Sequence, residues 1–445
     1  MRDWLWMGAG DLGRGIGAGE IDPEALCETF LDTIDAHAHR DTIFTRVTAD
    51  RARAEAAAAA GRARTGTRRG PLDGVPISWK DLFDSAGVPT ESGSALLKDR
   101  VPQEDAEVLA NATAGGSVCL GKTHMSELAF SGLGLNPMTA TPPNRHDPAR
   151  VPGGSTSGGA ASVAFGLAPV AIGSDTGGSV RNPAAWNDLV GLKTSHGRVS
   201  DRGTVPLVES MDTIGPLARN VEDCALALAL LEGTVPPDLA DANLHRRRFL
   251  VLTDYLETSR DEPRAACEQA IERFEAAGAT VERATLPSVA TAMDQTPHLF
   301  SPEAYAIWHE AIEAAPHLMF DRILERFRTG RDATAKDVIG AERRRRAAAA
   351  DYLAATAGYD AVLLPTSAIL PPERDRLLSD ETYYVEENLL ALRNTRVGNL
   401  LGLSALTLPT GVPMCGVMAM APPRQEHRLL RLGAAMEAAL GGPAR

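Results

Sequence analysis

Two glycine-rich segments, each built around a serine, have the residue types that acyl-transfer chemistry needs. Residues 153–159 read GGSTSGG and residues 175–179 read DTGGS, which places Ser155 and Ser179 24 residues apart. Glycine adopts backbone conformations closed to other residues, so such loops can direct N–H groups at a developing negative charge. The second segment therefore predicts an oxyanion hole next to Ser179.

A lysine upstream of both segments is the candidate base. Lys80 lies in the segment GVPISWKD at 74–81. A lysine that is shielded from water loses its proton readily, and this activates a serine without a histidine. The chain contains no Gly-x-Ser-x-Gly elbow, which argues against an α/β-hydrolase with a Ser-His-Asp triad.

With these motifs the chain resembles the amidase signature family. Segments 151–155 (VPGGS), 173–184 (GSDTGGSVRNPA) and 190–193 (VGLK) follow the order and spacing of the family signature, and segments 120–127, 211–219 and 402–409 also fit. The resemblance covers nearly the whole chain. It implies an α/β fold with a large mixed β-sheet that is covered by helices on both faces.

The resemblance also implies a Ser-cisSer-Lys triad. Ser179 would be the nucleophile, while Ser155, after a cis peptide bond from Gly154, and Lys80 would relay its proton. The oxyanion would be held by four successive backbone amides, those of Thr176, Gly177, Gly178 and Ser179.

Two charged residues and one tryptophan flank the nucleophile. Asp175 and Arg181 are expected to brace the loop rather than to react, although Arg181 could in addition contact an acidic substrate. Trp186 stands where small residues are usual in the family, so a reshaped wall of the substrate site is expected there.

The reaction that the resemblance implies is hydrolysis of an amide C–N bond, with extension to carbamates (urethanes) and esters. It places Phe130, Ser131 and Gly132 beside the reacting centre, although packing in the core is an equally good interpretation of Phe130. With Leu133 and Leu135 close by and no basic patch apparent, we expect small apolar or aryl amides as substrates and glutamine as a poor one. The alternative is the glutaminase subunit of a tRNA-dependent amidotransferase, which shares all three motifs and works in a complex.

Composition excludes several other classes of function. The chain has 445 residues, 44% of them hydrophobic and 23% charged, as in ordinary soluble enzymes. Its net charge of −13 disfavours nucleic-acid binding. No apolar run approaches the about 20 residues of a membrane span or forms a signal peptide. The ten histidines and five cysteines show no metal-ligand spacing. We therefore expect a cytoplasmic monomer or homodimer that acts on a small molecule without a metal or other cofactor.

The chain reads as one amidase domain over residues 1–445, since no linker divides it. Residues 1–68 are expected to form a helical N-terminal arm, 71–232 the signature core, and 291–357 a helical cover over the site. Residues 248–252 predict a strand, 263–278 a helix and 281 onward another strand, a βαβ-like unit. The four arginines at 343–346 predict a solvated helix face.

A P-loop pattern at 116–123, GSVCLGKT, is expected to be accidental. A phosphate cradle needs backbone amides that turn inward, whereas the triplet Val118, Cys119 and Leu120 is typical of a strand inside a sheet.

Overall fold

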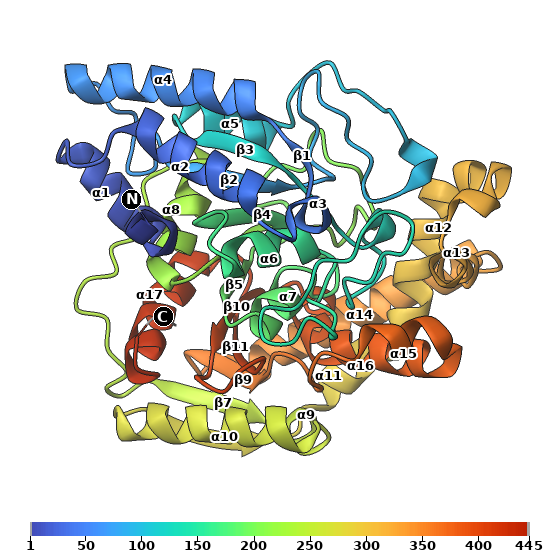
Figure 1. Cartoon of the computed structure of the whole chain (residues 1–445). Coiled ribbons are helices and arrows are strands. Elements are labelled where there is room, and N and C mark those ends of the chain that lie inside the picture. Colours follow the sequence, from blue (N-terminus) through green and yellow to red (C-terminus); the bar gives the residue numbers. More distant parts are fainter. Residues whose placement is uncertain (1, 443–445) are drawn as a thin grey trace.

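The computed structural model describes residues 2–442, so Met1 and residues 443–445 of the predicted domain lie outside it. An eleven-stranded mixed sheet crosses the molecule in the order β1-β3-β2-β4-β6-β5-β10-β11-β9-β7-β8 (Figure 1). The strands are β1 (Phe44–Val47), β2 (Pro76–Lys80), β3 (Val118–Thr123), β4 (Val170–Ser174), β5 (Val190–Lys193), β6 (Ile214–Ala218), β7 (Arg248–Leu252), β8 (Thr280–Ala284), β9 (Ala361–Pro365), β10 (Ser404–Pro409) and β11 (Gly416–Ala421).

The sheet contains two groups of parallel pairs separated by a run of antiparallel pairs. Strand β2 pairs in parallel with both β3 and β4, and β7 pairs in parallel with both β8 and β9. The strands between β4 and β9 are joined by antiparallel pairs. Every residue of β2, β3 and β4 is buried, as expected for strands covered on both faces. The predicted mixed α/β sheet is confirmed.

The N-terminal arm is helical with one exception. Its helices are η1 (Arg2–Trp6), α1 (Ala9–Gly17), α2 (Pro23–Ala36), α3 (Arg40–Ile43) and α4 (Ala49–Thr65). The exception is β1, which pairs antiparallel with β3 and forms one edge of the sheet. The prediction of a purely helical arm was therefore wrong. The four residues of β1 are extended because they pair with β3, and their own sequence does not alternate between polar and apolar residues.

Helices of the signature core lie on both sides of the central strands (Figure 1). Helices α6 and α7 pack on β2, β4, β5 and β10 from one side, while α8 and α17 pack on β4, β5, β6 and β10 from the other. The helices up to residue 232 are η2 (Ala95–Leu97), α5 (Glu107–Ala114), η3 (Glu127–Ala129), α6 (Ser157–Ala164), α7 (Arg181–Trp186) and α8 (Val221–Glu232).

The C-terminal half contains the predicted βαβ unit, in which α10 connects the parallel strands β7 and β8. The region 291–357 is helical as expected, and the arginines of α14 at 343, 344 and 346 are exposed. The remaining helices are α9 (Thr253–Glu257), α10 (Asp261–Ala276), α11 (Pro287–Met293), α12 (Thr296–Ala314), η4 (Pro316–Leu318), α13 (Asp321–Arg328), α14 (Ala335–Thr356), α15 (Arg374–Ser379), α16 (Glu381–Leu400) and α17 (Glu426–Ala439).

The P-loop pattern belongs to β3, as the apolar triplet predicts. Its lysine, Lys122, is buried, lies 3.1 Å from Asp81 and donates to Thr90 Oγ1 at 2.8 Å. The five cysteines are buried and unoxidised. No helix between residues 2 and 442 is long and apolar enough to cross a membrane.

Candidate active site

The carboxyl ends of two neighbouring parallel strands bring the candidate base to its partners. Lys80 ends β2 and Ser174 ends β4. The Lys80 Nζ donates to Ser155 Oγ at 2.7 Å and to Ser174 Oγ at 2.8 Å. The sequence predicted the first contact, whereas Ser174 was missed because a serine at the end of a strand has no distinguishing pattern.

The environment of Lys80 favours its neutral form. The side chain is fully buried, and this burial lowers the pKa of the ammonium group from 10.5 to about 7. The negative charges of Asp212 and Asp175 act in the opposite direction and keep the pKa from falling further. At neutral pH a large fraction of Lys80 can therefore accept a proton.

The two serine loops are joined directly. The peptide bond between Gly154 and Ser155 is cis, as the resemblance implies. The amide of Thr156 donates to the carbonyl oxygen of Ser179 at 3.2 Å, and Ser155 and Ser179 are both buried. Ser155, which contacts Lys80, is thus tied through the next residue to the loop of the candidate nucleophile.

Asp175 and Arg181 form a fully buried ion pair that braces this loop. The Arg181 Nη2 lies 2.8 Å from Asp175 Oδ1. Burial by itself would raise the pKa of the Asp175 carboxyl, but the charge and hydrogen bonds of Arg181 hold that pKa well below its usual range. Arg181 also donates to Thr395 O and Asn399 Oδ1. These contacts confirm the bracing role.

The predicted oxyanion amides divide into two groups. The amides of Thr176, Gly177 and Ser179 have no hydrogen-bond acceptor among residues 2–442 and are therefore available to a ligand. The amide of Gly178 differs, because it donates to Asp175 Oδ1 at 2.8 Å. The prediction that the Gly178 amide belongs to the oxyanion hole was therefore wrong. The sequence shows that this amide is unhindered, but it does not show that the Asp175 carboxylate accepts its hydrogen bond.

Asp212 is a neighbour of the site that the sequence did not single out. Its carboxylate accepts hydrogen bonds from the Thr176 hydroxyl and from the amides of Leu207 and Val208. Desolvation raises the pKa of Asp212 to about 6, and these hydrogen bonds oppose that rise. Asp212 thus links the loop of residues 175–179, the candidate oxyanion loop, to the electrostatic environment of Lys80.

The expected substrate-binding residues lie beside the serine loops. Gly132 O accepts hydrogen bonds from the Gly154 amide and from Asn182 Nδ2, both at 2.8 Å. The Ser131 hydroxyl and the Gly132 amide both donate to Asn388 Oδ1. Phe130 is buried and packs against Phe327, with ring centroids 4.7 Å apart and the two rings tilted by 60°. The polar groups of Ser131 and Gly132 are thus used in hydrogen bonds within the protein.

One face of α16 contacts both the oxyanion loop and the segment 131–132. Thr395 Oγ1 donates to Gly177 O at 2.7 Å, and Asn399 Nδ2 donates to Asp175 Oδ1 at 3.0 Å. A Cβ atom on Gly132 or Gly178 would collide with Leu392. Residues three or four apart share one helix face. This helical spacing is the sequence signal that could have identified the face of α16 that contacts the loop. The residues with this spacing are Tyr384, Asn388, Leu392, Thr395 and Asn399.

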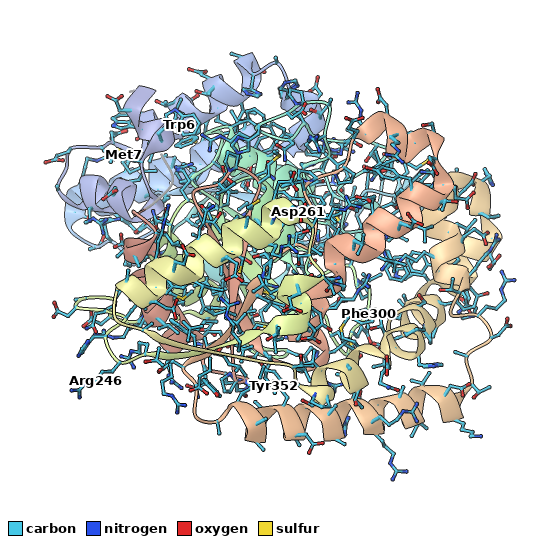
Figure 2. The ribbon with its side chains drawn as sticks, turned by 90° about the horizontal axis from the view of Figure 1, so that it is seen from below. Trp6, Met7, Arg246, Asp261, Phe300 and Tyr352 are labelled. Atoms are coloured by element: carbon cyan, nitrogen blue, oxygen red, sulfur yellow. The ribbon has the colours of Figure 1, made fainter. Side chains whose placement is uncertain are left out.

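Helices of the predicted cover reach the same loop. Phe300 of α12, labelled in Figure 2, would lie 3.8 Å from a Cβ atom placed on Gly177.

Trp186, expected to form a wall of the substrate site, packs into a buried apolar cluster with Leu133 and Leu135, and its Nε1 donates to Ile369 O at 3.1 Å. Trp186 therefore forms core behind the site.

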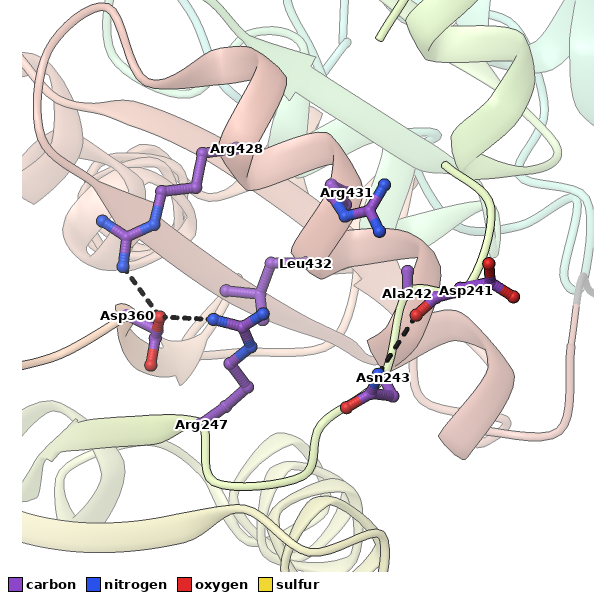
Figure 3. Close-up of a pocket in the computed structure, with 8 residues that line it drawn as sticks. All are labelled: Asp241, Ala242, Asn243, Arg247, Asp360, Arg428, Arg431 and Leu432. Atoms are coloured by element: carbon purple, nitrogen blue, oxygen red, sulfur yellow. Dashed lines mark hydrogen bonds and ion pairs between the residues drawn. The ribbon is translucent and has the colours of Figure 1, made fainter. Parts of the chain in front are cut away.

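A cavity of about 100 Å³ lies elsewhere and contains no triad residue (Figure 3). Its Asp360 lies 3.3 Å from Arg247 and 2.7 Å from Arg428, so charges of both signs meet there. The lining residues are Asp241, Ala242, Asn243, Arg247, Asp360, Arg428, Arg431 and Leu432.

Known proteins resemble the chain over almost all of its length. The model of the amidase family matches residues 25–430. A 2-amino-5-chloromuconic acid deaminase of Comamonas testosteroni is 37% identical, with 88% of this chain and 87% of the relative covered. A glutamyl-tRNA(Gln) amidotransferase subunit of Acidothermus cellulolyticus is 33% identical, with 99% and 95% covered. An inhibitor-bound structure from work on the origins of an s-triazine catabolic enzyme has a TM-score of 0.88 and 27% identity, with 98% and 99% covered.

Proposed function

Because the chain belongs to the amidase family, we propose that it hydrolyses amide C–N bonds through an acyl-enzyme on Ser179. The observation that supports this most strongly is the 2.7 Å hydrogen bond between the buried Lys80 Nζ and Ser155 Oγ. A lysine with a pKa of about 7 next to a serine hydroxyl is a general base ready to act.

In the first half of the reaction, neutral Lys80 accepts the proton of the Ser155 hydroxyl. Ser155 takes the proton of Ser179, and Ser179 Oγ attacks the carbonyl carbon of the substrate. The resulting oxyanion accepts hydrogen bonds from the free amides of Thr176, Gly177 and Ser179. This refines the four-amide set expected from the resemblance.

The second half of the reaction returns the proton. The relay passes it from Lys80 through Ser155 to the leaving nitrogen, so the C–N bond breaks and an amine departs. Water then attacks the Ser179 ester while Lys80 again accepts a proton through Ser155, which releases the carboxylic acid and restores Ser179. No cofactor enters these steps.

The acyl part of the substrate meets apolar side chains in this proposal. Phe300 and Leu392 stand next to Gly177 and Gly178, which supports small apolar or aryl amides, with carbamates and esters as extensions. The two relatives are named for different substrates, an aminochloromuconic acid and a tRNA-linked glutamyl group. Their names therefore do not indicate which class of amide this chain hydrolyses.

Trapping of the acyl-enzyme tests the proposal. We expect the enzyme mixed with a 4-nitrophenyl ester to release a burst of nitrophenol and to gain one acyl mass, which peptide mapping places on Ser179. Ser179→Ala should show neither. An adduct on another residue, or a Ser179→Ala protein that retains the burst, would reject the assignment.

The second candidate is a glutaminase subunit, which the relative from Acidothermus cellulolyticus favours through its coverage of the whole chain. This function requires ammonia release from glutamine and a partner chain. Light scattering after size exclusion should instead show a monomer or homodimer that hydrolyses anilides alone. A kcat/KM for glutamine above that for anilides would support the second candidate.

A further inference from the structure

Two arginines beside the catalytic loops have no acidic partner. Arg326 lies on α13 and Arg396 on α16. Neither guanidinium group has a carboxylate within 4.0 Å among residues 2–442. Burial lowers the pKa of Arg396, and the charge of Arg326 lowers it further.

Arg396 borders the oxyanion loop. Its side chain is only 5% exposed, and its Cγ would lie 3.6 Å from a Cβ atom placed on Gly177. Within the part of the chain that the structure describes, its guanidinium group donates no hydrogen bond. Arg396 is thus a buried cation with its N–H donors unused, and it lies beside the loop that carries Ser179.

Arg326 borders the segment 130–132 that supports the cis peptide. Its Nη1 donates to Phe130 O at 2.7 Å, and its Cζ lies 4.2 Å from the centroid of the Phe130 ring. Both contacts are with neutral groups. Arg326 therefore has no charged partner in these contacts.

Unpaired buried charge is costly, and several other buried cations use their donors on carboxylates or on backbone carbonyls. Burial lowers the pKa of Arg396 to about 9 and that of Arg326 to about 10, which reflects this cost. By contrast, Arg181 pairs with Asp175, and Arg198 lies 2.5 Å from both Glu232 and Glu426. An anion that enters the site would supply the missing counter-charge.

We propose that Arg326 and Arg396 bind a carboxylate on the acyl part of the substrate, so that the enzyme acts on a monoamide of a small dicarboxylic acid. This inference rests on the proposed amide hydrolysis, because it names the substrate class of the same site. A planar guanidinium group matches a carboxylate with two parallel hydrogen bonds. The apolar side chains of Phe300 and Leu392 then contact the carbon chain between the two ends.

The same contacts argue against glutamine. Its α-ammonium group would need an acidic partner, and the nearby carboxylates already accept hydrogen bonds from the protein, Asp212 among them. Glu127 accepts from Ser94 Oγ and from the amide of Phe320, while Asp175 is paired with Arg181. Glutamine would therefore bring a second, uncompensated charge into the site.

The expectation of an uncharged substrate relied on apolar residues near the motif and on the absence of a basic patch in the sequence. The structure adds two basic residues that the sequence did not single out, because α13 places Arg326 beside Phe130 and α16 places Arg396 beside Gly177.

Binding to an inactive protein tests the inference independently of turnover. In the Ser179→Ala background, calorimetry would compare succinanilic acid with 4-methylpentananilide, in which two methyl groups replace the carboxylate oxygens. We expect the acid to bind at least about tenfold more tightly, since hydrogen bonds between charged groups are the strong ones. Adding Arg396→Gln should abolish this preference, whereas the exposed Arg343→Gln should leave it unchanged.

The thermal midpoint separates loss of binding from loss of fold. Without ligand, Arg396→Gln should unfold at the same or a higher temperature, because it removes an unpaired buried charge. Equal affinity for the two anilides, undetectable binding of the acid at millimolar concentration, or a preference that survives Arg396→Gln would overturn the inference. Binding of the acid without turnover by the unaltered enzyme would instead reject the proposed hydrolysis alone.

Discussion

The carboxylate of Asp175 accepts a 2.8 Å hydrogen bond from the amide of Gly178, one residue before the candidate nucleophile. This contact closes the loop on itself and leaves three of four successive amides without an acceptor among residues 2–442. Arg181 holds the same carboxylate from the following helix. The shape of the oxyanion loop therefore depends on a buried ion pair as well as on its glycines.

Replacement by alanine should lower the stability of the protein at one of the two glycines of this loop but not at the other. At Gly178 the φ angle is +134° and a Cβ atom would lie 2.1 Å from Thr395 Oγ1. We expect Gly178→Ala to lose at least about 1–3 kcal/mol of unfolding free energy from backbone strain alone. Gly177→Ala meets only ordinary contacts at 3.6 Å and 3.8 Å, so it should unfold like the parent. Urea denaturation of both proteins checks this, and equal stability would contradict it.

Removal of any triad member should abolish turnover without unfolding the protein. Ser179→Ala, Ser155→Ala and Lys80→Met should each lower kcat for an anilide by about 1,000-fold or more, because the three groups act as one relay. The double variant of Ser155 and Lys80 should be no slower than about the worse single variant. Circular dichroism confirms the fold. Additive losses would indicate separate roles.

Activity should rise with pH around neutrality. Burial lowers the pKa of Lys80 to about 7, and only its neutral form accepts a proton, so the active fraction grows above that pH. We expect kcat/KM for an uncharged anilide to increase about tenfold from pH 6 to pH 8 and then to level off. A profile that falls across this range, in protein that remains folded, is incompatible with Lys80 as the base.

The charge of Asp212 should set the position of that profile. It raises the pKa of Lys80, and an asparagine can still bond to Thr176 and to the amides that Asp212 contacts. Asp212→Asn should therefore move the inflection of kcat/KM to lower pH. The exposed Asp201→Asn serves as the control and should leave the inflection in place. An unchanged inflection in Asp212→Asn would show that this carboxylate does not act on Lys80.

Local sequence patterns predicted much of the scaffold. The apolar runs at 118–120 and 248–252 lie in strands, as predicted. The core, in which helices and strands alternate along the chain, forms part of a mixed sheet. Strand β1 escaped prediction because four residues between two helices are extended only by pairing with β3. Ser174 escaped because its role depends on β2 and β4 being neighbours, which no local pattern encodes.

By itself the sequence determined the residue types on which the proposed chemistry depends, through the types and spacing of Lys80, Ser155 and Ser179. The tertiary structure alone decided how the loop 175–179 is held and which side chains surround it. Helix α16 bonds to Gly177 and Asp175 from more than 200 residues away and brings Arg396 beside Gly177. The physical reason is that reactivity follows from side-chain type, whereas desolvation and unpaired charge arise only when distant segments pack together.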